Sequence, residues 1–519
     1  MCSSDLFFLP IIGFLWLKER ITVRTVLAII LGFVGVVFVL RPGADTFQPV
    51  ALIGVAAALL AALAKVTIRD MADTEPTYRV VFYFGVIATL VSAVPLLWGW
   101  QTPDSLRVWM WLALIGVAWI GMELFTARPV GDAMAVTIWG SASSWTLTAL
   151  PLFVWMGEIL FRTRLSEDMF RGLAPWLERI PGRLIHTNII GCTIFAAVSG
   201  SSAATCATIG KMTLPELKRR GYPEDLSIGT LAGAGTLGLL IPPSIIMIVY
   251  GVTANVSIAK LFIAGVLPGL LLAGLFMGYT IVWALAHPGA IPPADRHYTF
   301  LEKISESRNL IPVVSLIAAV LGSIYTGIAT ATEAAALGVV GSLLIAATQR
   351  VLTWEAFRDS LLGATRLYCM IALILAGAAF LTLAMGYIGL PRHLAEWIGH
   401  LGLSPFALMI ALMVFYVVLG CFLDGISMVV LTMGVLLPTV EKAGFDLVWF
   451  GIFIVLVVEM AQVTPPVGFN LFVLQGMTKK EITWIARQTL PLFALMVAAV
   501  LAIWMFPGIV TWLPTQMGG

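Results

Sequence analysis

Hydroxyl-bearing side chains interrupt one of the long apolar stretches of this chain. Residues 196–210 read AAVSGSSAATCATIG, in which Gly200 permits a sharp turn. The hydroxyl oxygens around it belong to Ser199, Ser201, Ser202 and Thr205. Oxygen donors of this kind suit a hard monovalent cation such as Na⁺. We therefore expect a helical hairpin whose tip forms part of an ion- or substrate-binding site.

A second polar interruption lies in the later half of the chain. The segment FLDGISMVV places Asp424, Gly425 and Ser427 in an apolar run. A charge at bilayer depth costs about 2.5–3.5 kcal/mol on insertion scales, so an acid such as Asp424 suggests a function. We expect the tip of a second hairpin here.

Proline spacing relates the two interruptions to each other. The proline pair at 242–243 follows Pro215 by 242 − 215 = 27 residues, and the pair at 465–466 follows Pro438 by 465 − 438 = 27 residues. The pairs are 465 − 242 = 223 residues apart, and the same offset carries the Ser-Gly-Ser-Ser stretch onto residues 422–425. The matched spacing predicts an internal repeat of two halves.

Each proline pair is expected to break a membrane helix. A proline has no N–H, so the carbonyl four residues earlier loses its helical partner, and irregular backbone at membrane depth survives only inside protein or beside a polar cavity. Transporters bind ions and substrate at such breaks, where the next half-helix offers its positive N-terminal end to a carboxylate. The candidate site residues at the two breaks are Gly238, Leu239, Pro242, Pro243 and Ser244 in the first half, and Glu459, Ala461, Gln462, Thr464, Pro465, Pro466 and Asn470 in the second.

Two interpretations of Glu459 stay open. It is either part of the site or a protonated or hydrogen-bonded residue that packs helices together. Glu158 and Glu333 lie nearer to predicted helix ends and are interpreted as structural. The four interrupted segments hold no arginine and, as their only lysine, Lys211. An anionic substrate would therefore be neutralised mainly by helix dipoles and bound cations.

The composition predicts that these segments lie in a lipid bilayer. Of the 519 residues, 60% are hydrophobic and 11% charged, whereas soluble domains are roughly 45–50% apolar and about 25% charged. Apolar runs long enough to cross a bilayer core of roughly 30 Å recur along the chain. We expect an all-α polytopic membrane protein. Its net charge of +2 indicates no nucleic-acid partner, and its five cysteines and five histidines show no metal-ligand spacing, so no cofactor is expected.

The chain divides into unequal parts. Residues 1–6, MCSSDL, resemble the translation of a sequencing adapter and are expected to be an artefact. Residues 7–125 contain about five apolar spans, and their motif PIIGFLWLKERITVRTVLAIILGFVGVVFVLRPG resembles part of a drug/metabolite transporter superfamily exporter; a divergent fused small subunit is the alternative. The predicted repeats occupy residues 126–290 and 309–519, and a polar linker at 291–308 joins them. The arginine-rich stretch before the first hairpin, FRTRLSEDMFRGLAPWLERIPGRL, reads as an amphipathic helix at the membrane surface, with a charged loop as the alternative.

Five motifs together resemble a known transporter family. They are ALPLFVWMGEIL, AAVSGSSAATCATIG, GTLGLLIPPSIIMIVYG, GIATATEAAALG and TPPVGFNLFV. Over about residues 129–515 they are similar to the large membrane (DctM-type) subunit of tripartite ATP-independent periplasmic (TRAP) transporters. The resemblance implies an inverted-repeat elevator transporter in the bacterial inner membrane that imports organic acids, such as C4-dicarboxylates, with a Na⁺ gradient. It also implies two partners, a periplasmic solute-binding protein and a small four-helix membrane subunit.

The resemblance assigns positions to the binding site. The first hairpin tip would be residues 199–205 and the second residues 424–427. The breaks would be residues 238–244 and 462–468, with ion and substrate between them.

An intramembrane enzyme is the remote alternative. AVSGSS superficially resembles a membrane serine protease, but such an enzyme needs a histidine in a later helix, and none of the five histidines lies in the middle of a predicted span. The aspartyl type needs a Gly-x-Gly-Asp run, whereas GCFL precedes Asp424. We therefore expect a transporter and not an enzyme.

Overall fold

The computed structural model describes residues 106–126, 129–293, 298–465 and 468–516. All of them belong to one compact unit, Ser105–Gly519. The interpretations given to residues 1–6 and to most of the block at 7–125 lie outside the described residues. Within the described ranges every regular element is a helix, in agreement with the all-α prediction.

Long apolar helices dominate the described part of the chain. Six of its helices are long and apolar enough to cross a membrane, or up to eight if each of two bent pairs counts as one span. The six are α15 (Ile258–Ala286), α16 to α17 (Phe300–Tyr325), α18 (Ala331–Thr348), α19 (Trp354–Ile388), α22 (Gly425–Lys442) and α25 (Ile482–Met505). The bent pairs are α7 (Val130–Ala142) with η1 and α8 (Trp145–Phe161), and α12 and α13 (Glu224–Leu240) with α14 (Ile245–Thr253).

The helices around the predicted tips repeat at the offset found in the sequence. Ser202 and Gly425 begin equivalent helices, α11 and α22, and 425 − 202 = 223. Glu224 and Leu447 begin the next pair, α12 and α23, and 447 − 224 = 223. In the first half these elements are α10 (His186–Ser199), α11 (Ser202–Arg219), α12 (Glu224–Gly235), α13 (Leu237–Leu240) and α14. In the second half they are α21 (Pro405–Leu419), α22, α23 (Leu447–Gln462) and α24 (Phe469–Thr478).

Further helices flank these elements in both halves. Before the hairpins lie α6 (Leu106–Phe125), α7, η1 (Trp145–Thr148), α8 (Ala149–Phe161), α9 (Leu165–Leu177) and η2 (Arg183–Ile185) in the first half, and α18, α19 and α20 (Leu390–His400) in the second. After the breaks lie α15 and α25, and α26 (Gly508–Gln516) ends the described chain. Between the halves lie α16 (Phe300–Ser307), η3 (Arg308–Leu310) and α17 (Ile311–Tyr325).

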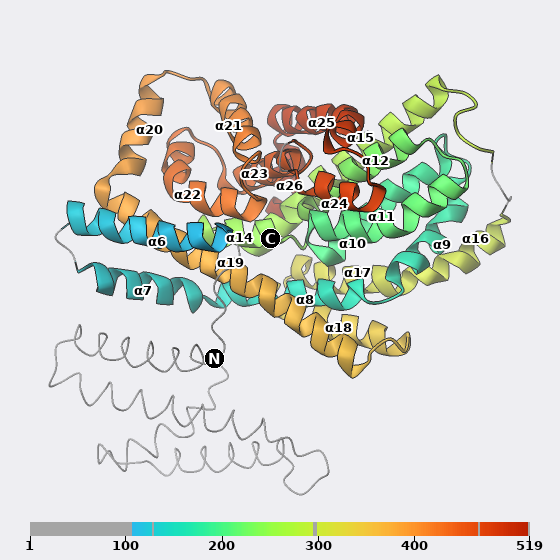
Figure 1. The fold of residues 1–519 in the computed structure, drawn as a ribbon, viewed down its shortest axis with the longest axis horizontal. Coiled ribbons are helices and arrows are strands. Elements are labelled where there is room, and N and C mark those ends of the chain that lie inside the picture. Colours follow the sequence, from blue (N-terminus) through green and yellow to red (C-terminus); the bar gives the residue numbers. More distant parts are fainter. Residues whose placement is uncertain (1–105, 127–128, 294–297, 466–467, 517–519) are drawn as a thin grey trace, which may run out of the picture. The chain divides into compact units, whose positions relative to one another are not determined.

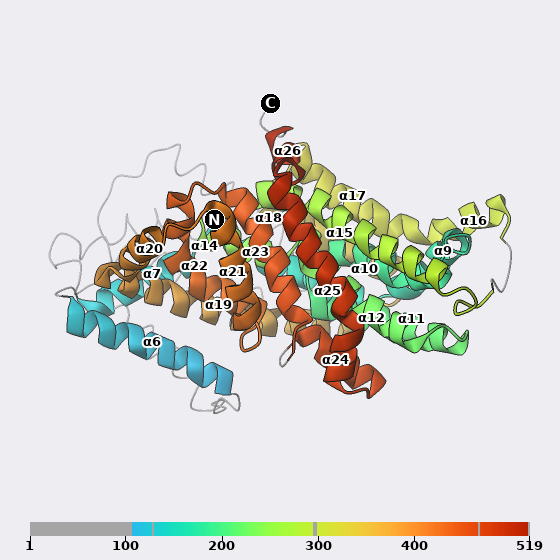
Figure 2. The same cartoon turned by 90° about the horizontal axis from the view of Figure 1, so that it is seen from above.

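Helix α23 lies at the centre of this unit. It is apolar on every face, which is typical of a helix surrounded by protein, and each of its residues from Trp449 to Gln462 is buried. Helices α13, α14, α15, α21, α22 and α25 pack around it (Figures 1 and 2). The two acceptor-bearing side chains near its C-terminal end, Glu459 and Gln462, are therefore held inside the protein.

A second group of helices borders the first hairpin. Helix α8 packs against α18 and α19, and α19 extends obliquely from α8 to α6 and α7 (Figure 1). Helix α8 also contacts α10 and α14. The first hairpin and the first break therefore lie against α8.

The arginine-rich stretch contains an amphipathic helix, α9. Leu165, Met169, Leu173 and Leu177 recur every four residues and are buried, whereas arginines at its ends stay accessible. Part of the predicted linker at 291–308 is also helical, because Thr299 and Glu302 form a capping box that starts α16. Helix α16 packs on α9 through an edge-to-face contact between Phe300 and Trp176.

Candidate functional site

The first predicted hairpin tip is a turn between two helices. Gly200 ends α10 in the left-handed conformation, with φ 60° and ψ 14°. Ser201 then caps α11, because its hydroxyl accepts a hydrogen bond from the N–H of Ala204 at 3.4 Å. The hydroxyls of Ser199 and Thr205 bond to each other at 2.6 Å. Three of the four predicted hydroxyls thus shape the tip as well as lining it.

The first tip packs directly on the first helix break. Helix α13 ends at Leu240, a cis peptide bond joins Pro242 to Pro243, and Ser244 caps α14 through the N–H of Met247 at 3.4 Å. A Cβ atom added to Gly238 would lie 2.6 Å from the carbonyl oxygen of Ser201. Only glycine allows this approach.

A buried carboxylate from the other half joins the tip to the break. Glu459 is fully buried, and its two carboxylate oxygens lie 2.8 and 2.9 Å from the hydroxyl of Ser202. The backbone N–H of Leu239 donates to one of these oxygens at 3.0 Å. Residues of both halves therefore meet at one point.

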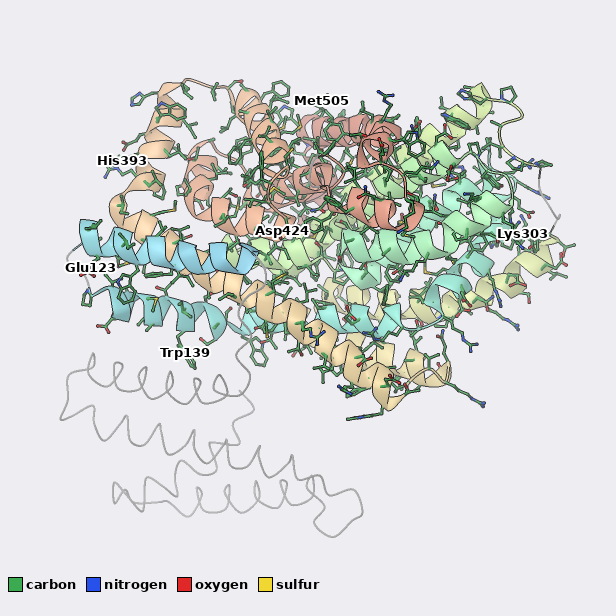
Figure 3. The ribbon with its side chains drawn as sticks, in the orientation of Figure 1. Glu123, Trp139, Lys303, His393, Asp424 and Met505 are labelled. Carbon is green, nitrogen blue, oxygen red and sulfur yellow. The ribbon has the colours of Figure 1, made fainter. Side chains whose placement is uncertain are left out.

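The second predicted tip is also a helix start. Asp424 caps α22: its carboxylate accepts bonds from the N–H and the hydroxyl of Ser427, at 3.3 and 2.5 Å. A Cβ on Gly425 would lie 2.5 Å from a methyl of Val458 and 2.8 Å from a methyl of Ile246. Figure 3 shows Asp424 beside α14, so the second tip packs against both halves.

The second break differs in one respect from the prediction. The carbonyl of Ala461 does not lose its partner, because the chain tightens into a turn and the N–H of Thr464 donates to it at 3.2 Å. The hydroxyl of Thr464 bonds instead to the carbonyl of Met460 at 2.7 Å. The carbonyl oxygen of Gln462 lies 2.7 Å from where a Cβ on Gly468 would stand, so that glycine also allows a close approach.

The remaining residues of the second break take different places. Pro465 is exposed, and its carbonyl accepts a bond from the thiol of Cys421 at 3.3 Å. Pro466 lies outside the described residues. Asn470 is fully buried near the start of α24 and donates to the carbonyl of Ala232 at 3.4 Å, while its own carbonyl oxygen has no hydrogen-bond partner. The structure thus brings the first tip, the first break and Glu459 together, whereas Asp424 and Asn470 are not bonded to that cluster.

A cavity of about 210 Å³ lies beside the first tip. Ser199 and Ser201 line it from the tip, Ile245 from the start of α14, and Glu158 from α8. Glu158 is the only ionisable side chain among its lining residues and pairs with Arg162 at 3.3 Å. The sequence alone favours a structural role for Glu158. No signal near it in the sequence marks it as a cavity residue, because the packing of α8 against the first hairpin places it there.

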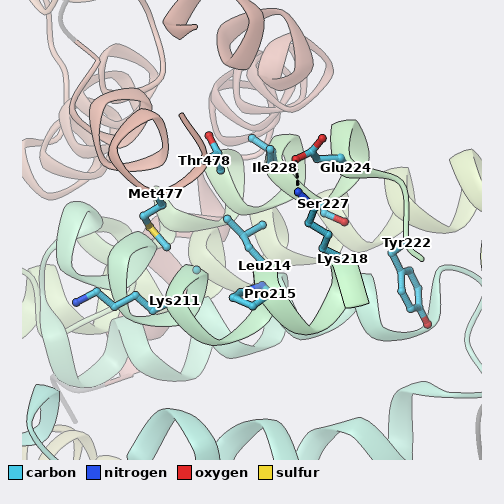
Figure 4. A pocket seen from close by; sticks show the side chains of 11 residues that line it. Lys211, Leu214, Pro215, Lys218, Tyr222, Glu224, Ser227, Ile228, Met477 and Thr478 are labelled. Atoms are coloured by element: carbon cyan, nitrogen blue, oxygen red, sulfur yellow. Dashed lines mark ion pairs between the residues drawn. The ribbon is translucent and has the colours of Figure 1, made fainter. Parts of the chain in front are cut away.

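A more voluminous cavity lies elsewhere in the described part of the chain. It measures about 460 Å³ and lies between α11, the start of α12 and the end of α24 (Figure 4). Lys218 and Glu224 at its edge pair with each other at 3.8 Å, and Lys480 also pairs with Glu224 at 3.0 Å. None of the predicted site residues lines it, so we place the candidate site at the smaller cavity.

Comparison with known proteins gives one consistent result. A family profile described as the tripartite ATP-independent periplasmic transporter, DctM component, matches residues 105–509. The match therefore includes α6, which sequence reasoning had assigned to the exporter-like block.

Two relatives and one solved structure illustrate the similarity. The C4-dicarboxylate TRAP transporter large permease protein DctM of Pseudomonas aeruginosa is 30% identical over 387 residues, covering 74% of this chain and 90% of that protein. The isethionate TRAP transporter permease protein DctMQ of Oleidesulfovibrio alaskensis is 33% identical over 428 residues, covering 82% and 66%. In fold, the chain resembles the Alcanivorax borkumensis YdaH transporter, with a TM-score of 0.54 at 14% identity, covering 79% of this chain and 97% of that one.

Proposed function

This chain belongs to the DctM family of TRAP transporter large permease subunits, and on that premise we propose that it imports a small organic acid with a Na⁺ gradient by an elevator movement. It is a multi-pass membrane transporter subunit and not an enzyme. The observation that carries the proposal is the meeting of the first tip, the first break and Glu459 beside a cavity.

Oxygen atoms at the first tip and break are our proposed Na⁺ ligands. The carbonyl of Ser201 lies against Gly238, and prolines at 242 and 243 leave the carbonyls of Gly238 and Leu239 without the N–H groups that would continue the helix. Backbone carbonyls and hydroxyls are the donors that a hard cation prefers. Asp424 with Ser427 marks the equivalent position in the second half, where we propose further ion contacts.

The cavity beside the tip is our proposed place for the carboxylate of the cargo. The N-terminal end of α14 opens onto it at Ile245, and such an end carries a positive partial charge. Glu158, in contrast, would repel an anion: two like unit charges 4 Å apart repel by about 4 kcal/mol at an effective dielectric constant of about 20. Arg162 offsets part of this repulsion. A co-bound cation would offset the rest, and this supports coupling to Na⁺.

The proposed movement follows from the two groups of helices. The tips and breaks pack around the buried helix α23, whereas the cavity is bounded on its other side by α8 and α19. A cavity at the boundary of two groups can change its opening when one slides past the other. We propose that the group around α23 carries ion and cargo past α8 and α19.

The proposed partners are those of the family, a periplasmic solute-binding protein and a small membrane subunit, in the bacterial inner membrane. The block predicted at residues 7–125, into which the DctM profile extends from residue 105, has two alternative interpretations, an exporter-like fragment or a fused small subunit. The relative named DctMQ supports asking whether that block replaces the separate small subunit. The identity of the acid is left open in this proposal, because the relatives are named for different substrates, a C4-dicarboxylate and isethionate.

Uptake into proteoliposomes tests the proposal. The full chain is reconstituted with the small subunit and binding protein encoded beside it, and uptake of labelled succinate, isethionate and related acids is measured under an inward Na⁺ or K⁺ gradient. We expect accumulation of at least one acid with Na⁺ and none with K⁺. Equal uptake under both gradients would refute the Na⁺ coupling.

Deletion of residues 1–104 separates the two interpretations of the N-terminal block. An exporter-like fragment predicts that the shortened chain, with its small subunit, takes up the acid as the full chain does. A fused small subunit predicts that uptake is lost unless a separate small subunit is added.

A further inference from the structure

Glu459 makes polar contacts with the first half only. Its carboxylate oxygens accept from the hydroxyl of Ser202, 257 residues away in sequence, and from the N–H of Leu239, 220 residues away. Ser202 is the first residue of α11, and Leu239 lies in the short helix α13 next to the break. We call these hydrogen bonds the Glu459 clamp.

The Glu459 clamp joins the first tip to the first break, two segments that touch but share few polar contacts of their own. The tip approaches the break through the carbonyl of Ser201 and the Cα of Gly238, a contact that supplies no strong bond. A weak hydrogen bond from the N–H of Ile245 to the carbonyl of Gly200, at 3.4 Å, is the other link. The bonds to Glu459 are shorter, at 2.8 to 3.0 Å, and they lie inside the protein, where no water competes for the same groups.

The repeat contains no matching clamp in the opposite direction. At the offset of 223, the counterpart of Glu459 is Thr236, since 459 − 223 = 236, and the counterpart of Ser202 is Gly425. Thr236 donates its hydroxyl to the carbonyl of Gly233 in its own helix, and Gly425 has no side chain. A side chain of the second half therefore holds the first tip and break, whereas Thr236 and Gly425 form no equivalent contact from the first half to the second.

We propose that Glu459 is a positioning residue that sets the geometry of the first ion site from the second half of the protein. It holds Ser202 and Leu239 so that the carbonyls of Ser201 and Gly238 stay in ligand positions, and it is not itself an ion ligand. Because α23 ends at its own break three residues later, at Gln462, a change at the second break is transmitted to the first site. This inference rests on the proposed Na⁺ coupling.

A double-mutant cycle tests the clamp. The full chain is purified as wild type, Glu459→Gln, Ser202→Ala and the double variant, and the Na⁺ dependence of thermal stabilisation is measured in NaCl against KCl. An ion that binds only the folded state stabilises it by RT ln(1 + [Na⁺]/Kd), so the concentration dependence of the shift reports the affinity. Glu459→Gln keeps one acceptor oxygen and replaces the other with an amide nitrogen that cannot accept a hydrogen bond. Ser342→Ala is the matched control, because Ser342 is also fully buried but bonds only within α18.

We expect both single variants to lose Na⁺ affinity, and we expect the two losses not to add in the double variant. Leaving a buried hydrogen-bonding group without its partner costs about 1–3 kcal/mol, so each single variant should raise the half-saturating Na⁺ concentration by about fivefold or more. The double variant should bind Na⁺ with the same affinity as the weaker-binding of the two single variants, because each single substitution already removes the same contact. The control should match wild type. Wild-type affinity in either single variant, or fully additive losses, would overturn the clamp.

Hydrogen exchange distinguishes failure of the clamp from failure of the Na⁺ proposal. In Na⁺-free buffer, both variants should exchange faster than wild type in residues 199–205 and 236–241 and not in α18. If Na⁺ does not stabilise the wild-type protein, the proposal of Na⁺ coupling is refuted. The exchange pattern in Na⁺-free buffer then still tests whether Glu459 holds the two segments. Unchanged exchange at both segments would refute it whatever the ion.

Discussion

Gly238→Ala tests how closely the first tip must approach the first break. The added Cβ would stand 2.6 Å from the carbonyl oxygen of Ser201, 2.7 Å from its carbonyl carbon and 2.7 Å from the Cα of Ser202. All three are backbone atoms, so no side chain can rotate out of the way. Ordinary contact begins at 3.4 Å, so the tip must retreat by about 3.4 − 2.6 = 0.8 Å.

The expected cost follows from this displacement. Overpacking of a well-packed site costs about 1–3 kcal/mol. If that cost falls on the ion-bound geometry, it lowers Na⁺ affinity by roughly five- to 100-fold, because about 1.4 kcal/mol corresponds to a factor of ten. We expect the half-saturating Na⁺ concentration for uptake in proteoliposomes to rise by this factor.

Gly274→Ala is the matched control for this substitution. Gly274 also lies in a helix, α15, but a Cβ there would meet no atom within 4 Å. Alanine in a helix is favoured over glycine by roughly 0.5–1 kcal/mol, so this variant should be at least as stable as wild type and transport normally. Unchanged Na⁺ dependence in Gly238→Ala, with the variant folded, would refute the close contact between tip and break.

Three further substitutions address the rest of the site. Asp424→Asn should insert and fold normally, since asparagine also caps helices well, but it should lose Na⁺-dependent uptake because it removes the carboxylate charge. Asp424→Ala should lose uptake as well, and loss of the helix cap should destabilise the protein by about 1 kcal/mol. Ser201→Ala combined with Ser202→Ala should impair Na⁺-dependent uptake while membrane insertion, followed by protease accessibility, stays intact; normal uptake kinetics would argue against the tip as a site. In Gly157→Ala the new Cβ would lie 3.2 Å from the carbonyl oxygen of Ser199, so maximal uptake rate should fall by roughly fivefold for a cost of about 1 kcal/mol, with Na⁺ affinity unchanged. A change in affinity without a change in rate would contradict a sliding contact there.

The positions of the interruptions could be predicted because their causes are local. Glycines at 200 and 425 and proline pairs at 242 and 465 act on the backbone within a turn of themselves, so their spacing in the sequence located all four interruptions between helices. The same local reasoning was wrong about the carbonyl of Ala461. A missing N–H four residues later predicts a free carbonyl only if the helix continues straight, and here the turn brings the N–H of Thr464 to it.

The partners of the buried groups could not be predicted, because they depend on how distant helices pack. Glu459 carries no mark in its neighbourhood that identifies Ser202 as its donor, and the two open interpretations of Glu459 differ only in tertiary contacts. Glu158 illustrates the same limit. Its place near the end of a helix is typical of a structural acid, and only the approach of α8 to the first tip makes it a wall of the cavity.

In the proposed mechanism, the ion site and the boundary of movement lie on different sides of the first tip, and the contacts give a reason for this separation. Ion ligands must keep their geometry, so they belong where both halves fix them, and the first tip and break are held by Glu459 from the fully buried helix α23. In the same proposal, cargo must enter and leave, so its site belongs where the packing of helices is interrupted. The cavity is such a place, because it lies between α8 and the helices that carry the first tip and break. The first tip contacts both places. Ser202 bonds to Glu459 on one side, whereas Ser199 and Ser201 line the cavity on the other. In the proposed mechanism, a Na⁺ ion that orders the tip from the inner side would also shape the cavity on the outer side, and this shared segment would couple ion to cargo.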